Sequence, residues 1–349
     1  MELLSVTMND GVKPRSEIEG KDNSSEDKSN YKIVRKGDMV YNSMRMWQGA
    51  NGISPCDGIV SPAYTVLMPK QEINNGYFAA LFKSVTLINE FRKNSQGMTS
   101  DTWNLKYPQI ETIKVQIPSV SEQDKVSEMF SVLDERIAAQ SQLVESLKKY
   151  KRGLLMHYFS DDKTQLWTQC SVSQIGKVIT GSTPPTNDRS NYDGDLLFCA
   201  PGDVGEQKYI SSTEKRVSPK GFALGRPLPP NSVIVTCIGL IGKLGIAKTS
   251  MITNQQINAL VVSEGIDHEF IYYAFENFFP EYRSKVSMQT LPILSKSEFE
   301  KLMIKVPDLD VQHKISSHLA AMDRRIEHTQ QELNALIEHR RGIMQQLFI

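Results

Sequence analysis

The sequence predicts an α+β protein built from two mixed, sheet-dominated globular domains, each followed by a long amphipathic helix. Three observations predict this class: an internal repeat, a heptad pattern within the repeated part, and short strand-like runs separated by turn residues upstream of it. The length of 349 residues suits two domains. A single hydrophobic core stops growing beyond roughly 250 to 300 residues.

The repeat is clearest when the chain is shifted by 189 residues, which aligns residues 118–160 with residues 307–349 without a gap. Twelve of the 43 aligned positions are identical, among them Pro118 with Pro307 and Gln123 with Gln312. Ungapped identity over this length indicates that one unit is present twice. We therefore expect globular domains at residues 1–118 and 161–306, and helices at residues 119–160 and 307–349.

Both repeated segments carry the alternating four-three spacing of apolar residues that is typical of a coiled-coil seam. The seam positions are Val126, Phe130, Leu133, Ile137, Val144, Leu147, Leu154 and Tyr158 in the first segment, and Ile315, Leu319, Met322, Ile326, Leu333, Leu336, Ile343 and Leu347 in the second. Polar residues interrupt the seam at matching places, namely Gln140 and Lys151 in one helix and Thr329 and Arg340 in the other. Polar seam residues fix register and partner, so each helix is expected to have a specific mate. We predict Ser121 and Asp310 as the N-caps.

The alternative is that each helix packs only on its own domain. At 1.5 Å per residue, a helix of this size extends about 50 to 60 Å, which exceeds the face of a domain of this size. Length therefore favours the paired helices.

The globular parts are predicted from short apolar runs and turn residues. In the second copy we expect strands at residues 196–200, 232–238 and 259–262 and a helix at 270–279; in the first, strands at 38–42 and 63–68 and a helix at 77–93. Residues 36–40 align with 230–234, and only 35 residues precede this block in the first copy. The first domain is therefore expected to be shortened at its start and to lack the segment that holds Gly181 to Pro184 in the second. Residues 15–30 are polar and are interpreted as a mobile loop.

Composition excludes several functional classes. The four cysteines form no CxxC pair and the six histidines show no ligand spacing, so we expect reduced cysteines and no metal site. Forty basic residues balance forty acidic ones, so any DNA affinity must be local or shared with partners. The N-terminal residues lack an apolar signal region and no run is long enough to span a bilayer, which predicts a cytoplasmic protein without a membrane partner.

Several blocks of the sequence resemble the specificity subunit of type I restriction-modification enzymes. In the second copy these are Trp167 with Ile175-Gly176, then residues 180–184, 232–235, 241–243 and 253–257; in the first they are residues 34–41 and 58–64. The proline-led helices, with Gln123 or Gln312 and Lys125 or Lys314, are similar to the spacer of that family. Each block is short, but their order is found twice.

The resemblance implies two target recognition domains that each read half of a split double-stranded DNA target, joined by two antiparallel helices in a pseudo-twofold, coiled-coil spacer. Half-sites on one face of the duplex lie about one turn apart, roughly 34 Å, so a rigid spacer sets the gap in the target. The family also implies partners: methylation subunits, which dock on the helices and carry the cofactor, and restriction subunits. No cofactor is expected on this chain.

The residues themselves argue against an enzyme. An adenine methyltransferase needs Asn or Asp before a Pro-Pro pair, but Thr183 and Leu228 stand there. Residues 239–245 do not form a phosphate loop, because Leu244 follows Lys243 where Ser or Thr would bind magnesium. No catalytic residue is therefore assigned.

Sequence is read at base edges by side chains, so the candidate DNA-binding residues are polar, basic or aromatic residues on domain loops. They are Ser182, Thr183, Asn187, Arg189, Lys243 and Gln255 in the second domain, and Arg45, Trp47, Gln48, Ser100 and Asn104 in the first. For each the alternative is a framework role: Thr183-Pro184 shaping a loop, residues 254–256 bonding the backbone, and Trp47 lying in a core.

Basic residues gather near the C-terminal ends of both helices: Lys148, Lys149, Lys151, Arg152, Arg340 and Arg341. Favourable interaction with the helix dipole is the simpler explanation. Their presence in both copies also suits docking of methylation subunits. Three functions stay open: a DNA-specificity subunit, an assembly scaffold that recognises only one half-site, and an unrecognised nuclease or methyltransferase.

Overall fold

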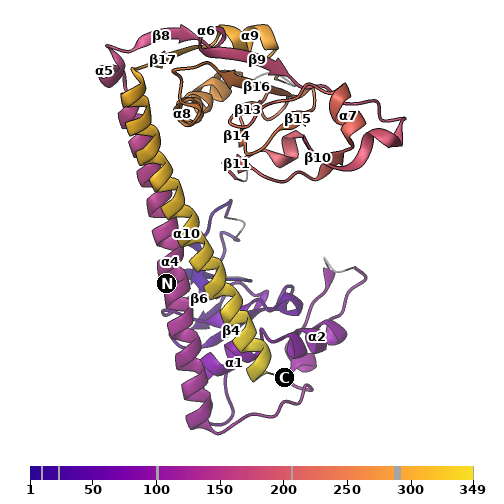
Figure 1. Cartoon of the computed structure of the whole chain (residues 1–349). Helices are drawn as coiled ribbons and strands as arrows, with labels where there is room; N and C mark the ends of the chain where they lie inside the picture. The colour runs from indigo at the N-terminus through magenta and orange to yellow at the C-terminus, as the bar shows by residue number, and fades with distance from the viewer. Residues whose placement is uncertain (9–10, 23, 100–101, 206, 287–291, 349) are drawn as a thin grey trace. The chain divides into compact units, whose positions relative to one another are not determined.

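The computed structural model describes residues 1–349 except 9–10, 23, 100–101, 206, 287–291 and 349 (Figure 1). The chain divides into two compact units: unit 1 comprises Met1–Leu143 and Thr329–Ile349, and unit 2 comprises Val144–His328. Each unit contains sheets, short helices and parts of two long helices, α4 (Val120–Tyr158) and α10 (Leu309–Leu347). The predicted α+β class is confirmed.

Unit 2 is built around a five-stranded sheet with the order β11-β14-β13-β16-β9. Its strands are β9 (Gly176–Thr180), β11 (Tyr209–Ile210), β13 (Val233–Thr236), β14 (Leu244–Ala247) and β16 (Ile257–Val262). Two smaller sheets have the orders β12-β10-β15 and β17-β8, with β8 (Thr168–Ser171), β10 (Tyr192–Cys199), β12 (Lys215–Val217), β15 (Met251–Thr253) and β17 (Met303–Val306). The helices are α5 (Asp161–Thr164), α6 (Val172–Ile175), α7 (Pro219–Leu224), α8 (His268–Val286) and α9 (Lys296–Lys301), with single 3-10 turns η4 (Arg189–Asn191) and η5 (Pro201–Asp203).

Unit 1 contains a four-stranded sheet, β2-β1-β6-β3, and a three-stranded sheet, β5-β4-β7. The strands are β1 (Glu2–Thr7), β2 (Gly11–Pro14), β3 (Lys32–Val34), β4 (Met39–Asn42), β5 (Asn51–Ile53), β6 (Gly58–Val60) and β7 (Tyr64–Leu67). The helices are α1 (Asn75–Leu81), α2 (Val85–Asn94) and α3 (Tyr107–Ile110), with 3-10 turns η1 (Arg15–Glu17) and η2 (Met46–Gln48).

The two units share a strand topology. In unit 1, β4 pairs antiparallel with β5 and β7, as β13 pairs with β14 and β16 in unit 2. Likewise β1 runs parallel to β6, as β10 runs parallel to β15. The duplication that is visible in the helices thus extends into the globular parts. Among the described residues of unit 1, however, nothing corresponds to β8, α6 and β9.

A buried glutamine anchors each long helix to its unit in the same way. The Gln123 side chain accepts from Asn74 N at 3.0 Å and donates to Pro118 O at 2.9 Å. Gln312 accepts from Asp267 N at 2.8 Å and donates to Pro307 O at 2.9 Å. Both side chains are buried, so the identical glutamines of the repeat satisfy backbone groups where each helix leaves its sheet.

Within each unit the segments of α4 and α10 run antiparallel. In unit 1, Gln140 Nε2 donates to Thr329 O at 3.2 Å, and Arg340 Nη2 donates to Asp134 Oδ2 at 3.0 Å. In unit 2, Lys151 Nζ lies 2.6 Å from Asp323 Oδ1. The polar residues that interrupt the apolar seam therefore bond to the facing helix, which is how polar seam positions fix register.

Several predicted boundaries need correction. The expected helix at 77–93 is wrong as a single element, because the chain turns at residues 82–84 and the Ser84 hydroxyl caps a second helix by accepting from Leu87 N. The predicted caps Ser121 and Asp310 are also wrong. The helices begin earlier: Asp308 Oδ1 accepts from Val311 N at 2.9 Å, and Ser119 bonds the Glu122 carboxylate. The helix expected at 270–279 extends over His268–Val286.

The described part of the loop at residues 15–30 contains no strand, as expected, but it has internal bonds. The Arg15 guanidinium donates to three backbone carbonyls, those of Ile18 at 2.6 Å, Gly20 at 2.9 Å and Lys21 at 2.7 Å. Its Nε also lies 3.6 Å from Asp22 Oδ1. One arginine therefore organises the first half of this segment.

None of the helices that the structure describes combines the length and apolarity needed to cross a membrane.

Two of the four cysteines lie in cores and two are half-buried. Burial raises the pKa of Cys199 to about 12 and that of Cys237 to about 11, whereas Cys56 and Cys170 are partly accessible. Because the thiolate is the reactive form, iodoacetamide at pH 8 should modify Cys56 and Cys170 first and leave Cys199 and Cys237 unmodified until the protein unfolds. Peptide mass spectrometry measures this directly. Equal labelling of all four thiols in the native protein would contradict the described cores.

Candidate nucleic-acid interface

The connection from β9 to β10 in unit 2 holds four of the residues predicted to contact DNA. It starts at Gly181, where an added Cβ would lie 2.1 Å from Asn254 O and 2.3 Å from Thr253 O. Only glycine allows the two backbones to approach this closely. Ser182 N then donates to Thr253 O at 2.8 Å, which joins the loop to the turn between β15 and β16.

This approach brings together two candidates that lie far apart in the sequence. Thr183 Oγ1 donates to Gln255 Oε1 at 2.6 Å. In the same turn, Asn254 Oδ1 accepts from Gln256 N at 3.0 Å, so Asn254 has the framework role that was the alternative for this block. Thr183 is exposed, and Gln255 presents its amide beside it.

The rest of the loop is held at its base and exposed at its tip. Tyr192 Oη donates to Pro184 O at 2.6 Å, and Asn191 Nδ2 donates to Pro185 O at 3.0 Å. The proline pair therefore does shape the loop. Asn187 and Arg189 extend beyond these anchors with exposed side chains.

Two basic residues that the sequence did not indicate join the same surface. Lys220 Nζ lies 2.8 Å from Asp188 Oδ2, and this hydrogen bond, with those from Ser190, lowers the pKa of Asp188 to about 2. Arg226 Nη1 donates to Thr180 O at 2.9 Å. Lys220 lies in α7 and Arg226 lies in the loop after it. Each is more than 30 residues along the chain from the residue that it contacts. Only the fold brings them here.

Lys243 occupies a different loop, between β13 and β14. Its backbone N donates to Thr236 Oγ1 at 3.0 Å, and its aliphatic stem passes Gly205. The side chain is half-buried, and none of the hydrogen bonds among the described residues joins it to the 181–191 loop. Lys243 is therefore a separate point of possible contact.

In unit 1 the corresponding loop, between β4 and β5, holds Arg45, Trp47 and Gln48. The Trp47 ring lies edge-on to Trp103 at a centroid distance of 5.1 Å, and the Arg92 guanidinium lies 5.9 Å from the Trp47 ring centre. Trp47 is half-buried and belongs to none of the core clusters, so it is not the core residue that was the alternative.

Asn104 lies beside this aromatic pair. Residues 96 and 104 form an isolated antiparallel bridge, and Leu105 N donates to Ser43 O at 2.8 Å, next to the β4–β5 loop. The fold thus groups four of the five candidates of the first domain and adds Arg92 and Trp103. Ser100, the fifth, lies outside the described residues. The Trp47–Trp103 pair with the Arg92 cation could not be predicted from residue spacing in the sequence, because the three residues come from separate segments.

The basic residues near the helix ends fall into two sets. Lys151 and Arg340, at equivalent positions of the repeat, bond Asp323 and Asp134 on the facing helix. The charges of both side chains are therefore already paired within the chain. Lys149, Arg152 and Arg341 are exposed, and Lys148 pairs with Glu145 one turn away at 3.0 Å. Arg341 likewise pairs with Glu338 one turn away at 3.2 Å, so the described ion pairs of these four residues stay within their own helices and leave them accessible to a partner.

A half-buried polar network lies among the helices of unit 2. Lys151 Nζ lies 2.8 Å from the Glu276 carboxylate as well as 2.6 Å from Asp323. Tyr273 Oη donates to Asp323 at 2.6 Å and accepts from Lys208 Nζ at 2.9 Å. Burial raises the pKa of Glu276; for Lys151, burial opposes the charged form, but Glu276 and Asp323 outweigh it and raise the pKa. The network connects α4, α8 and α10.

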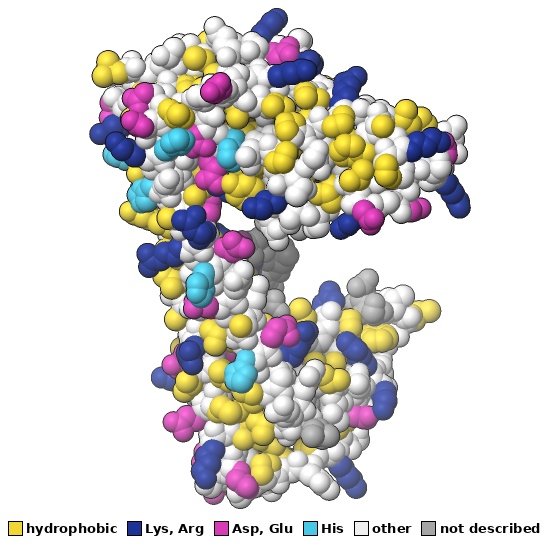
Figure 2. Space-filling view, in the orientation of Figure 1, with side chains coloured by type: hydrophobic (Ala, Val, Ile, Leu, Met, Phe, Trp, Pro, Cys, Tyr) yellow, Lys and Arg dark blue, Asp and Glu magenta, His cyan; other side chains and the backbone are white. Residues whose placement is uncertain are grey.

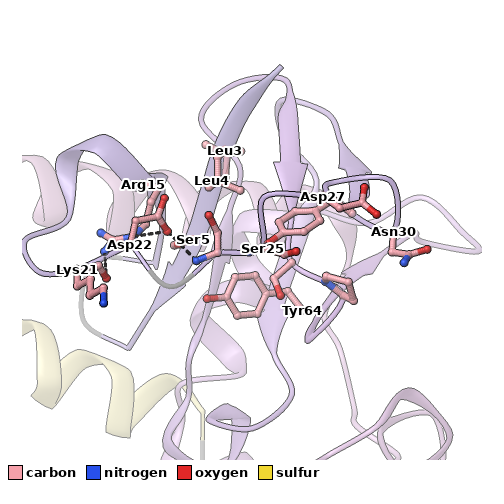
Figure 3. A pocket seen from close by; sticks show the side chains of 14 residues that line it. Leu3, Leu4, Ser5, Arg15, Lys21, Asp22, Ser25, Asp27, Asn30 and Tyr64 are labelled. Atoms are coloured by element: carbon pink, nitrogen blue, oxygen red, sulfur yellow. Dashed lines mark hydrogen bonds and ion pairs between the residues drawn. The ribbon is translucent and has the colours of Figure 1, made fainter.

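A cleft of about 630 Å³ opens beside β1 in unit 1 (Figure 3). It is lined mainly by hydroxyl, amide and charged side chains of β1, the loop at residues 15–31 and Tyr64. Figure 3 shows the Arg15 and Asp22 side chains pointing toward one another, in line with their ion pair. Because these charges are paired internally, the cleft offers polar contacts without a strong net charge.

The described residues contain no group of three or more His, Cys, Asp and Glu side chains that could hold a metal ion. Figure 2 shows Lys and Arg side chains interspersed with acidic and uncharged ones over the visible face, in keeping with the balanced composition. Neither unit shows a continuous basic stripe on this face.

Comparison with known proteins identifies the family. The family model described as the type I restriction modification DNA specificity domain matches residues 5–149 and 165–339. The MjaIX specificity subunit of Methanocaldococcus jannaschii is 30% identical over 178 residues, which cover 49% of this chain and 41% of that protein. The HindI specificity subunit of Haemophilus influenzae is 20% identical over 361 residues, covering 80% of this chain and 79% of that protein.

Solved structures show the same fold. The S subunit of a type I restriction-modification system from M. genitalium aligns with a TM-score of 0.62 at 16% identity, over 91% of this chain and 84% of that one. A chain from a study of complex assembly and conformational transition of the type I system aligns with a TM-score of 0.61 at 16% identity, over 93% and 84%. The resemblance found in the sequence blocks is confirmed. The chain belongs to the family of type I restriction-modification DNA specificity proteins.

Proposed function

We propose that this chain reads a bipartite double-stranded DNA target, with residues 1–118 and 161–306 as two target recognition domains and residues 119–160 and 307–349 as the spacer between them. The observation that carries the proposal is the matched position of the candidate residues. The β4–β5 loop presents Arg45, Trp47 and Gln48, and the equivalent β13–β14 loop presents Lys243. One fold used twice thus offers different side chains from the same site, as two readers of different half-sites require.

The proposed contacts are of two kinds. Asn187, Thr183 and Gln255 have the amide and hydroxyl groups that read base edges, and Arg189, Lys220 and Arg226 can position the loop on phosphates. In unit 1, the Trp47–Trp103 pair with Arg92 offers an aromatic and cationic surface. The chain's zero net charge means that these local groups, with partner subunits, supply the DNA affinity.

We further propose that methylation subunits dock on the spacer helices and that restriction subunits join through the complex, in the cytoplasm where the DNA lies. The chain needs no cofactor of its own in this arrangement. Co-expression with its methylation subunit, followed by genome-wide mapping of methyladenine, tests the function. A split motif is expected. Absence of methylation from an assembled complex would refute DNA recognition by this chain.

One observation favours a second candidate, an assembly scaffold that reads a single half-site. The described residues of unit 1 have no counterpart of β8, α6 and β9, so the 181–191 loop that follows β9 in unit 2 has no equivalent there. The same methylation map separates the two functions, because a scaffold with one reader would give a contiguous half motif.

Docking is tested at the exposed basic residues. The double substitution Lys149→Glu and Arg341→Glu should weaken assembly with the methylation subunit by about tenfold, since charge reversal at a complementary surface costs on the order of 1.4 kcal/mol or more. Size-exclusion chromatography and titration calorimetry measure it. Lys285→Glu, at an exposed lysine of α8, is the matched control. Unchanged assembly and DNA affinity in the double variant would remove these residues from the interface.

A further inference from the structure

In unit 2, the segment Thr168–Thr180 forms a strand–helix–strand cover over one side of the domain. Strand β8 pairs with β17, and β9 pairs with β16 over five residues. Between them, the short helix α6 places Val172 and Ile175 in the core, and β9 adds Val178. These three side chains are 0 to 3% exposed and contribute to the same core as α8, α9 and β17.

The surfaces that this segment covers in unit 2 also exist in unit 1. Strand β7 is the equivalent of β16, and helix α3 is the equivalent of α9. Residues 113–117 are the equivalent of residues 302–306, which include β17. The equivalence is fixed by a shared hydrogen bond, because Leu105 N donates to Ser43 O as Leu294 N donates to Cys237 O. In the part of unit 1 that the structure describes, β7 pairs with β4 alone and residues 114–117 lie in no strand.

The apolar side chains on these surfaces are more exposed in unit 1 than in unit 2. Val115 is 38% exposed, whereas its equivalent Ile304 is 6% exposed. Five further positions show the same difference: Leu67, Phe78, Phe82, Ile117 and Val126 are half-buried, whereas their equivalents Leu260, Ile271, Phe275, Val306 and Ile315 are buried. Unit 1 therefore has an apolar face, formed by β7, α3 and residues 113–117, from which water is not excluded; we call it the open face.

We propose that the open face is a docking site for a strand–helix–strand peptide segment of the same kind as Thr168–Thr180. Its second strand adds antiparallel to Thr65–Met68, as β9 adds to Asn258–Val261 of β16, and its first strand pairs with residues 114–117. Pro69 has no N–H group and ends the paired stretch. Apolar residues spaced like Val172, Ile175 and Val178 fill the space among Leu67, Phe82 and Val115. This proposal is independent of whether unit 1 reads DNA, because it concerns the binding of a peptide segment.

The aromatic contacts mark where the segment begins. In unit 2, the Phe159 ring lies 5.6 Å from Phe270 and 6.0 Å from Trp167, which leads into β8. The equivalent Phe348 lies 5.5 Å from Tyr77 and 6.0 Å from Phe130. Phe348 thus already occupies the position of Phe159, and a docked tryptophan would complete the cluster. The segment should therefore include a residue like Trp167.

The test uses the full chain and a synthetic peptide with the sequence of residues 165–182, carrying Cys170→Ser to prevent oxidation. Hydrogen exchange followed by mass spectrometry should show slower exchange at residues 64–68 and 113–117 when the peptide is added, and no change at β16 and β17. In a second form, the same segment is appended after Ile349 through a flexible linker, which raises its effective concentration to the millimolar range. The same two stretches should be protected in that chain.

Two variants introduce a carboxylate at positions where the proposal requires apolar contact. A peptide with Val178→Asp should bind at least about tenfold more weakly, and Val115→Asp in the chain should have the same effect. Val132→Asp, at an exposed valine of α4, should leave binding unchanged. The proposal is overturned if neither the added nor the appended segment protects residues 64–68 and 113–117. It is equally overturned if protection survives Val178→Asp, or if the chain instead forms dimers that cover the open face without the peptide.

Discussion

Lys151→Ala should destabilise unit 2 by about 2 to 4 kcal/mol, because it leaves two carboxylates uncompensated. The Lys151 side chain is 12% exposed and lies 2.8 Å from Glu276 and 2.6 Å from Asp323, whose side chains are 31% and 27% exposed. Removal of one partner of a fully buried ion pair costs about 3 to 5 kcal/mol, and partial exposure of the two acids reduces this figure. Calorimetry should show the unfolding transition of unit 2 lowered by about 5 to 10 °C.

The penalty should depend on pH in a defined direction. Burial raises the pKa of Glu276 above its ordinary value of 4.5, and Lys151 opposes that rise. Without the lysine, the folded-state pKa rises further. A group whose folded-state pKa is raised contributes stability below its unfolded pKa and loses it as pH increases through the folded pKa. The cost of Lys151→Ala should therefore be largest at pH 8 and shrink as pH falls toward 4.5.

Two variants complete this test. Lys151→Arg keeps the charge and copies Arg340, which occupies the equivalent position in unit 1 and bonds Asp134, so most stability should be retained. Lys148→Ala removes an exposed pair with Glu145 and should change stability by less than about 0.5 kcal/mol. Equal effects of Lys151→Ala and Lys148→Ala would show that the network does not stabilise unit 2.

The long helices could be predicted from the sequence because their information is local and periodic. A heptad repeated without a gap defines both the helices and their apolar faces. Their first residues could not be read correctly, because Ser119 and Ser121 are both capping residues two positions apart, as are Asp308 and Asp310. The choice between them depends on where the preceding chain turns.

The sheets and the candidate interface were less accessible to prediction. The parallel pairing of β1 with β6 joins Glu2 to Gly58, and no periodicity links segments that far apart. The same limit applies to Thr183 with Gln255 and to Arg226 with Thr180, which meet only because β9 and β16 are neighbours. Residue type identified Thr183 and Gln255 as candidates, whereas Lys220 and Arg226 carried no local signal and required the fold.

Gly181→Ala is expected to weaken recognition by unit 2 strongly while leaving most of the protein folded. A Cβ at this position would lie 2.1 Å from Asn254 O and 2.3 Å from Thr253 O. Both are backbone atoms, which cannot move aside as the end of a flexible side chain could. The loop must move away, which breaks the bond from Ser182 N to Thr253 O and separates Thr183 from Gln255. Overpacking of this kind costs about 1 to 3 kcal/mol.

The effect on function should be larger than the effect on stability, because the displaced loop also presents Asn187 and Arg189. Loss of two or more base-edge contacts, each worth about 1 to 3 kcal/mol, predicts a decrease in DNA affinity of at least about thirtyfold. Mapping of methyladenine should then lose or relax one half of the split motif and keep the other. Gly202→Ala is the matched control, since an added Cβ there meets nothing within 4 Å. If Gly181→Ala and Gly202→Ala methylate the same complete motif, the 181–191 loop does not read DNA and the assignment must shift to the β13–β14 loop that holds Lys243.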